Sequence, residues 1–171
     1  MKQIIGFAGF GLACLNGLFS ILALALNVWM ESDHENQDGG YASYGLFKYC
    51  GKFSQGYVCN EIPPVGQVLA ARGFVALGMI LMLGAAVTAG VRVFFLKDKN
   101  ILYLVTVGLS IAAGFCLLIG FATYVSFFGH YVSTGSFRYG GGFALCVIAW
   151  LFSWIQAGVF FVHGRMPDSP A

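Results

Sequence analysis

The stretch ILYLVTVGLSIAAGFCLLIGFATYVSFF, residues 101–128, contains no charged side chain. A helix needs about 20 consecutive apolar residues to cross the hydrocarbon core of a bilayer. This stretch exceeds that length, and three others resemble it, at 4–26, 68–95 and 141–162. The sequence therefore predicts four membrane spans in a single domain, residues 1–171, with both termini on the same side.

Composition agrees with a chain that lies in lipid. Hydrophobic residues make up 58% of it and charged residues 9%, whereas a soluble domain carries about 25% charged residues. A soluble protein this apolar would expose large apolar patches to water. The net charge of +2, without a basic tract, gives no indication of nucleic-acid binding.

Orientation is predicted from the lysines and arginines of the short loops, which favour the cytoplasm. The side that holds both termini would carry Lys2, Arg92, Lys97, Lys99 and Arg165. The other side would carry Lys48, Lys52 and Arg138, with Arg72 at the boundary. We therefore expect the termini and the loop 96–100 to be cytoplasmic, and the loops 28–67 and 129–140 to be extracellular, in the plasma membrane.

The first span has a competing interpretation. Lys2 followed by an apolar run that ends in Ala-Leu-Ala, residues 23–25, resembles a cleavable signal peptide. The apolar part of a signal peptide is typically about 7–15 residues long. The longer run here favours a helix that is retained.

Two of the five cysteines lie in the first predicted outer loop. Cys50 and Cys59 are close in sequence, and an extracellular compartment is oxidising. Their separation suits a hairpin closed by a disulfide. A metal pair is the alternative, but further Cys or His ligands are lacking nearby. The other cysteines, Cys14, Cys116 and Cys146, fall within spans, where we expect small buried packing residues.

The rest of this loop predicts two strands joined by a turn. Residues 44–49 are rich in aromatic side chains and indicate a strand, residues 51–56 a turn, and residues 57–59 a returning strand. The acidic segment 31–40 is predicted to be flexible. Pro63 and Pro64 then end the strand and lead into the second span.

The order of residues in this loop resembles the signature of the claudin superfamily. Trp29 follows the first span, and Gly45-Leu46-Phe47 comes next, ahead of the two loop cysteines. The superfamily, which includes claudins, peripheral myelin protein, the epithelial membrane proteins and the lens fibre membrane intrinsic protein, has Trp where this chain has Phe47, so an indole N–H donor is lost. Arg72 matches the arginine with which the second span of that family begins.

The resemblance implies an α-helical membrane protein, with a left-handed four-helix bundle and a small extracellular antiparallel β-sheet. Two features leave the branch open. The chain ends in Pro-Asp-Ser-Pro-Ala, residues 167–171, without the PDZ-binding ending of many claudins. No Asn is followed by x-Ser or x-Thr, so the N-glycosylation sequon common in the myelin and epithelial branch is missing.

Arg72 has two interpretations. A charge near the membrane boundary can extend its head group into water. Alternatively it anchors the outer sheet by hydrogen bonds to carbonyls near Trp29, Leu46 or Phe47.

Small and polar residues within the spans predict where helices meet. Small side chains let helix backbones approach closely in membranes, and they recur at Gly9, Ala13, Gly17, Ala86, Gly90, Gly108, Ala112, Ala149, Ser153 and Ala157. Asn16, Asn27 and Gln156 are expected to hydrogen bond across helices, typically for about 0.6–2 kcal/mol. These polar groups are too few for a substrate path through the bundle.

The residues predict neither an enzyme nor a cofactor or metal site. His34, His130 and His163 are not spaced for catalysis or metal binding, and Gly140-Gly141-Gly142 lacks the rest of a nucleotide site. This glycine run is expected to let the loop enter the membrane.

Function is then expected on the surface of the fold. The first hypothesis is a structural or adhesion protein of cell–cell contacts or junctions, which associates with itself laterally and across the intercellular gap. Aromatic anchors for such contacts would be Tyr41, Phe53, Phe127 and Phe128. The alternative is an auxiliary subunit of a channel or receptor, or an organiser of membrane lipid. Partners would accordingly be the chain itself, other four-span proteins, a channel or receptor, or lipid.

Overall fold

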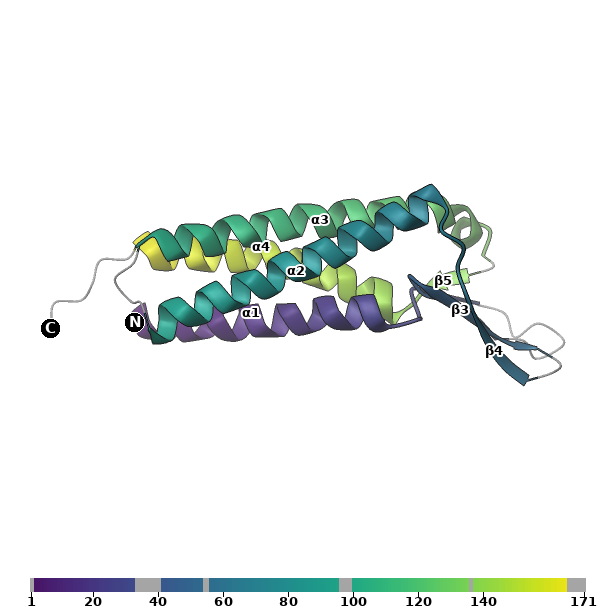
Figure 1. Cartoon of the computed structure of the whole chain (residues 1–171), viewed down its shortest axis with the longest axis horizontal. Coiled ribbons are helices and arrows are strands. Elements are labelled where there is room, and N and C mark those ends of the chain that lie inside the picture. Colours follow the sequence, from purple (N-terminus) through teal and green to yellow (C-terminus); the bar gives the residue numbers. More distant parts are fainter. Residues whose placement is uncertain (1, 33–40, 54–55, 96–99, 136, 166–171) are drawn as a thin grey trace, which may run out of the picture.

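Four long helices form the body of the protein in the computed structural model, which describes residues 2–32, 41–53, 56–95, 100–135 and 137–165. The helices are α1 (Lys2–Ala25), α2 (Gly66–Phe94), α3 (Asn100–Ser133) and α4 (Gly141–Arg165). Each is long and apolar enough to cross a membrane. Both termini lie at one end of the bundle and the strands at the other (Figure 1). The predicted fold class is confirmed.

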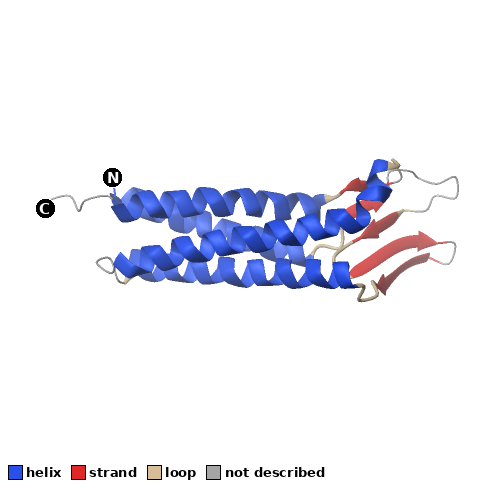
Figure 2. Ribbon diagram, turned by 90° about the horizontal axis from the view of Figure 1, so that it is seen from above, coloured by secondary structure: helices blue, strands red, loops and turns tan. Residues whose placement is uncertain are grey.

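Five strands form one antiparallel sheet at the end of the bundle away from the termini (Figure 2). They are β1 (Met30–Ser32), β2 (Ala42–Tyr44), β3 (Lys48–Phe53), β4 (Gly56–Glu61) and β5 (Phe137–Tyr139). Their order across the sheet is β4-β3-β2-β1-β5. Because β5 lies between α3 and α4 in the sequence, both predicted outer loops contribute to the same sheet.

The third helix is longer than predicted. It runs to Ser133, although the sequence predicted the span to end at 128 and a loop to follow. At 1.5 Å per residue its 34 residues extend about 50 Å, compared with about 30 Å for the hydrocarbon core. The last turns of α3 therefore stand beside the sheet, where Tyr131 packs edge-on against Phe137 of β5.

The predicted strand over 44–49 is wrong in its middle. Residues 45–47 connect β2 to β3, and the Gly45 amide donates to the Lys48 carbonyl at 2.8 Å. The predicted turn over 51–56 is also too wide, because β3 continues to Phe53 and β4 begins at Gly56. The predicted flexible segment 31–40 begins as strand β1, and its residues 33–40 lie outside the described residues.

The main core lies where the bundle meets the sheet. Its buried members come from α1, α2, α3, α4 and the sheet, and they include Trp29, Leu46, Val68, Tyr124 and Cys146. A smaller core of Ala13, Ala89 and Phe160 lies nearer the termini. The sheet is thus packed onto the helices through a shared apolar core.

Most of the predicted small residues lie at helix contacts. A Cβ added to Gly9 would lie 3.1 Å from the Phe160 ring, and one at Gly90 would lie 2.9 Å from the Phe10 ring. Gly108 is an exception, because nothing lies within 4 Å of its Cβ position. Helix α3 instead meets α2 at Gly120, where the added Cβ would lie 2.6 Å from a Val75 methyl group. The prediction for α3 is therefore wrong at Gly108.

Candidate contact site at the sheet end of the bundle

Trp29 connects the end of α1 to the sheet. Its ring is fully buried, and its Nε1 donates to the Ala23 carbonyl at 2.7 Å. The ring packs on Tyr124 of α3 at a centroid distance of 4.9 Å. Its backbone amide donates to the Tyr44 carbonyl of β2 at 2.8 Å. Both the indole donor and the apolar body of this residue are therefore used.

The glycine run at the start of α4, Gly140 to Gly142, is the surface on which the chain around Trp29 rests. The Gly142 amide donates to the Val28 carbonyl at 2.7 Å, and the Gly140 amide donates to the Trp29 carbonyl at 2.9 Å. A Cβ at Gly142 would lie 2.6 Å from the Trp29 ring, closer than ordinary packing allows. Besides leading into α4, the run therefore lets two backbones approach closely.

Gly45 fits a second close approach. A Cβ there would lie 2.5 Å from the Cα of Asn27, so the β2–β3 turn rests directly on the segment after α1. The next residue, Leu46, is fully buried in the core. Asn27, which was predicted to bond across helices, lies past the end of α1 at this turn.

Arg72 joins α2 to both ends of the β3–β4 hairpin. Its Nε donates to the Leu46 carbonyl at 2.7 Å, just before β3. Its Nη2 donates to the Ile62 carbonyl at 2.8 Å, just after β4. The guanidinium also lies 5.3 Å from the centroid of the Phe47 ring, within the range of a cation–π contact. The anchoring role predicted for Arg72 is confirmed for the Leu46 carbonyl, and the Ile62 partner was not predicted.

A disulfide joins the two strands of this hairpin. Cys50 of β3 is bonded to Cys59 of β4, as predicted. The cysteines in the helices differ from their prediction, because Cys14 is exposed and Cys116 partly exposed, and only Cys146 is buried. An exposed position on a spanning helix faces lipid, where a thiol needs no packing partner.

The hydrogen-bond pattern of the hairpin determines which backbone groups of β4 point away from β3, along its free edge. The Ile62 amide donates to the Phe47 carbonyl at 2.9 Å, so this pair is of the hydrogen-bonded kind and the kinds alternate along the ladder. Cys50 and Cys59 then form a non-hydrogen-bonded pair, in agreement with their Cα separation of 4.1 Å. It follows that Tyr57, Cys59 and Glu61 direct their backbone N–H and C=O groups away from β3.

Strand β4 lies at the edge of the sheet, and all six of its residues are exposed. The Tyr57 side chain is 63% exposed and that of Val58 41%. Sequence reasoning did not select either residue, although a short aromatic and β-branched strand beside a disulfide is a usable signal. Within the described residues, β4 is the longest strand that pairs on one side only.

The aromatic residues proposed as contact anchors divide into three groups. Tyr41 is 39% exposed and donates to Glu31 Oε2 at 3.0 Å; partial burial first, and Glu31 next, raise its pKa. Phe128 is buried, and Phe127 packs partly buried against the main core, so neither is an exposed anchor. Both were placed at the end of the predicted span 101–128, and α3 continues past them to Ser133. The Phe53 side chain lies outside the described residues.

The profile of the amastin surface glycoprotein family matches residues 14–160. The chain belongs to the amastin family. The match includes Trp29, the sheet, the disulfide and Arg72, so the features that resemble claudins occur here in an amastin. No curated protein matches the chain.

The membrane-spanning part of this amastin contains a polar network. Gln156 of α4 donates from Nε2 to Ser110 Oγ of α3 at 2.9 Å. Asn16 of α1, in the amide orientation that satisfies both of its ends, donates to the Ala149 carbonyl of α4 at 3.1 Å. The three polar side chains are fully buried. The cross-helix bonds predicted for Asn16 and Gln156 are therefore present, in a packed interior.

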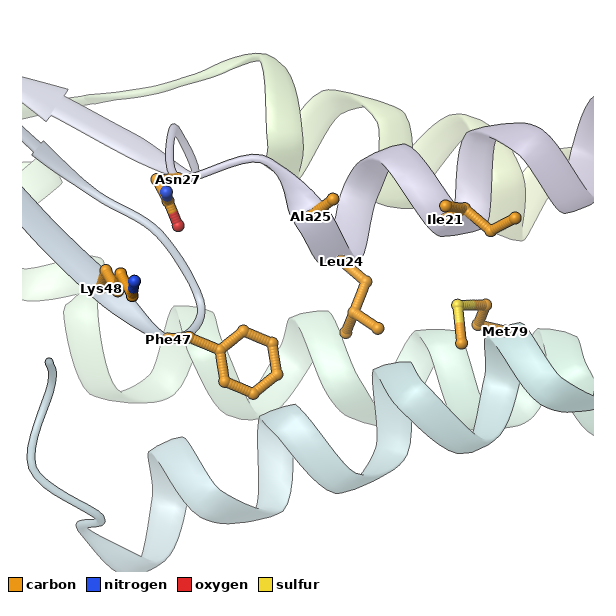
Figure 3. A pocket seen from close by; sticks show the side chains of 7 residues that line it. All are labelled: Ile21, Leu24, Ala25, Asn27, Phe47, Lys48 and Met79. Carbon is orange, nitrogen blue, oxygen red and sulfur yellow. The ribbon is translucent and has the colours of Figure 1, made fainter.

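A groove opens between α1 and α2 directly below the sheet. Its volume is about 410 Å³, and its lining residues are Ile21, Leu24, Ala25, Asn27, Phe47, Lys48 and Met79. In Figure 3 the apolar side chains from α1, α2 and the β2–β3 turn point into the same space, and Lys48 and Asn27 lie at its sheet end. This amastin thus combines a free sheet edge with a groove on the flank of the bundle.

Proposed function

We propose that this amastin is a non-enzymatic structural protein of the cell surface that acts in contacts between cells by associating with other copies of itself. In this proposal the sheet is extracellular and both termini are cytoplasmic. Support for the orientation comes from the disulfide, which requires an oxidising compartment, and from the lysines and arginines near the termini. The family name, amastin surface glycoprotein, agrees with a surface location.

The single observation that carries the proposal is the free edge of β4. An edge strand offers unpaired backbone groups that can pair with another chain. The outward groups of Tyr57, Cys59 and Glu61 form such a row, and the exposed rings of Tyr57 and Tyr41 add apolar area. Natural proteins usually protect an edge of this kind unless it has a partner.

A hairpin held by a disulfide and by Arg72 suits this role. The disulfide holds β4 to β3, and Arg72 holds both ends of the hairpin to α2. Because the hairpin is ordered before it meets a partner, little conformational entropy is lost on association. Two β4 strands from different copies would pair antiparallel, which gives a two-fold symmetric contact.

The test separates backbone pairing from side-chain contact. Tyr57→Pro removes an outward N–H without removing a bond to β3, and proline is tolerated on edge strands. Tyr57→Thr removes the ring and keeps the N–H. Cells that express each variant are examined by freeze-fracture imaging and by aggregation in suspension. For wild type we expect rows or clusters of intramembrane particles in the freeze-fracture images, together with aggregation of the cells. Both should be lost in Tyr57→Pro and partly retained in Tyr57→Thr.

Two results would favour other functions. Wild-type cells with an unchanged membrane and no aggregation would contradict self-association. Co-purification of a channel or receptor in fixed stoichiometry with monomeric wild type would favour the auxiliary subunit instead. If Tyr57→Pro and wild type formed the same rows of intramembrane particles, β4 would be excluded as the contact.

A further inference from the structure

The groove between α1 and α2 has an apolar part and a polar end. Ile21, Leu24 and Met79 form its walls, and Figure 3 shows them on the side away from Lys48 and Asn27. An amphipathic ligand matches this division. The volume of the groove, about 410 Å³, lies within the usual range of small-molecule sites, roughly 300–1,000 Å³.

The apolar walls are continuous with the surface of the bundle that faces lipid. Ile21 is 40% exposed, and its neighbours on the outer faces of the two helices are also exposed, namely Leu18, Leu22, Leu77 and Ile80. Water does not stably fill a space lined by apolar groups. At this depth the available apolar molecules are the acyl chains of the bilayer, so an acyl chain fits the space.

The polar end lies at the level of the lipid head groups. Helix α1 has 24 residues and is therefore about 36 Å long, slightly more than the hydrocarbon core of about 30 Å. Ala25 at its end marks the boundary of the core. Asn27 and Lys48 lie just beyond it, where glycerophospholipids carry their phosphate.

We propose that this groove binds one acyl chain of a membrane glycerophospholipid and that Lys48 binds its phosphate. The Lys48 side chain is exposed and lines the groove. The guanidinium of Arg72 lies 5.3 Å from the centroid of the Phe47 ring and adds positive charge. Glu61 is the cross-strand partner of Lys48 and shares its face of the sheet. A zwitterionic head group, with its ammonium toward Glu61 and its phosphate on Lys48, matches this pair.

The test measures binding of two lipids with identical acyl chains. Purified wild type in detergent is titrated with phosphatidylethanolamine or with the corresponding diacylglycerol, and bound lipid is counted by native mass spectrometry. We expect phosphatidylethanolamine to bind at least about tenfold more tightly, because its phosphate makes a charge-assisted hydrogen bond that diacylglycerol cannot make. The second lipid lacks only the phosphate and its head group.

Matched variants locate the site. Lys48→Gln should abolish the preference for phosphatidylethanolamine, whereas Lys52→Gln, on the same strand but away from the groove, should keep it. Ala25→Trp should fill the groove and weaken both lipids, whereas Leu22→Trp, which also faces lipid on α1, should not. Retention of the Cys50–Cys59 disulfide verifies the fold of each variant. Equal binding of the two lipids by wild type, or an unchanged preference in Lys48→Gln, would overturn the proposal.

Discussion

The Nε of Arg72, in the second turn of α2, donates to the backbone carbonyl of Leu46 at 2.7 Å. Leu46 is fully buried, and its carbonyl lies in the turn that enters β3. The same guanidinium reaches the Ile62 carbonyl at 2.8 Å, where the chain leaves β4. One side chain on a spanning helix therefore fixes both ends of the hairpin that carries the free edge.

Arg72→Ala should loosen the hairpin and reduce delivery to the cell surface. Two charge-assisted hydrogen bonds are lost, and two carbonyls in a partly buried region lose their donor, so we expect destabilisation of about 2–4 kcal/mol. Limited proteolysis of purified protein, together with surface labelling of cells, measures both effects. Arg72→Lys should recover only part of the loss, because an ammonium group cannot reproduce the planar geometry of the two bonds.

Arg138→Ala provides the matched control. Arg138 pairs with Glu31 at 3.0 Å, and its side chain is 63% exposed. An exposed ion pair is worth at most about 1 kcal/mol, so this variant should behave nearly as wild type does. Equal protease sensitivity of the Arg72 and Arg138 variants would show that the hairpin does not depend on the hydrogen bonds from Arg72.

Gly142→Ala should destabilise the junction between α4 and the chain around Trp29. The added methyl group would lie 2.6 Å from the Trp29 ring, and overpacking in a tight core costs about 1–3 kcal/mol. Thermal unfolding in detergent, followed by tryptophan fluorescence, measures the change. Gly141→Ala is the control, because nothing lies within 4 Å of that Cβ position. A similar melting temperature for the two variants would refute the close-approach argument.

Local sequence was sufficient to predict the helix bundle and the Cys50–Cys59 disulfide. Apolar runs long enough to span a bilayer left helices as the only solution, since each backbone polar group must be satisfied within the segment. The Cys50–Cys59 bond followed from a shared loop and an oxidising compartment. The contact between Arg72 and the loop carbonyls was one of two interpretations, and its support came from the resemblance to claudins.

The errors occurred where distant segments decide the structure. The aromatic stretch around Gly45 has high strand propensity, but contact with Asn27 requires a turn there. Phe128 was expected to be an exposed contact anchor at the end of the third span, and it is buried because α3 continues beside the sheet. The packing face of α3 was misjudged at Gly108, because a helix that is apolar on all sides has no periodicity to indicate which face meets protein.

Removal of the disulfide should affect the hairpin more than the bundle. In the chain-entropy treatment, a loop of this length, with a separation of nine residues, corresponds to about 3 kcal/mol. Cys50→Ser with Cys59→Ser should therefore increase proteolysis within 48–61 and leave the helical circular dichroism unchanged. Cys14→Ser, at an exposed thiol, should have no effect on either measurement. A loss of helical signal in the double variant would show that the bundle itself depends on the disulfide.

The orientation can be tested by glycosylation, because the natural sequence contains no Asn-x-Ser or Asn-x-Thr sequon. Wild type should therefore keep its electrophoretic mobility after treatment with an N-glycosidase. Lys52→Asn creates a sequon with Ser54 in the hairpin, and Lys52 is exposed. If the sheet enters the secretory lumen during synthesis, this variant should acquire a glycan that the enzyme removes.

A sequon placed in a tag after Ala171 tests the opposite side. The C-terminal end of α4 lies at the end of the bundle away from the sheet (Figure 1), so only one of the two sequons can reach the lumen in a given topology. The sheet-outside orientation predicts a glycan on Lys52→Asn and none on the tag. The reverse result would place the disulfide in the reducing cytosol, where such bonds are rare, and would remove the basis for contacts between cells through β4.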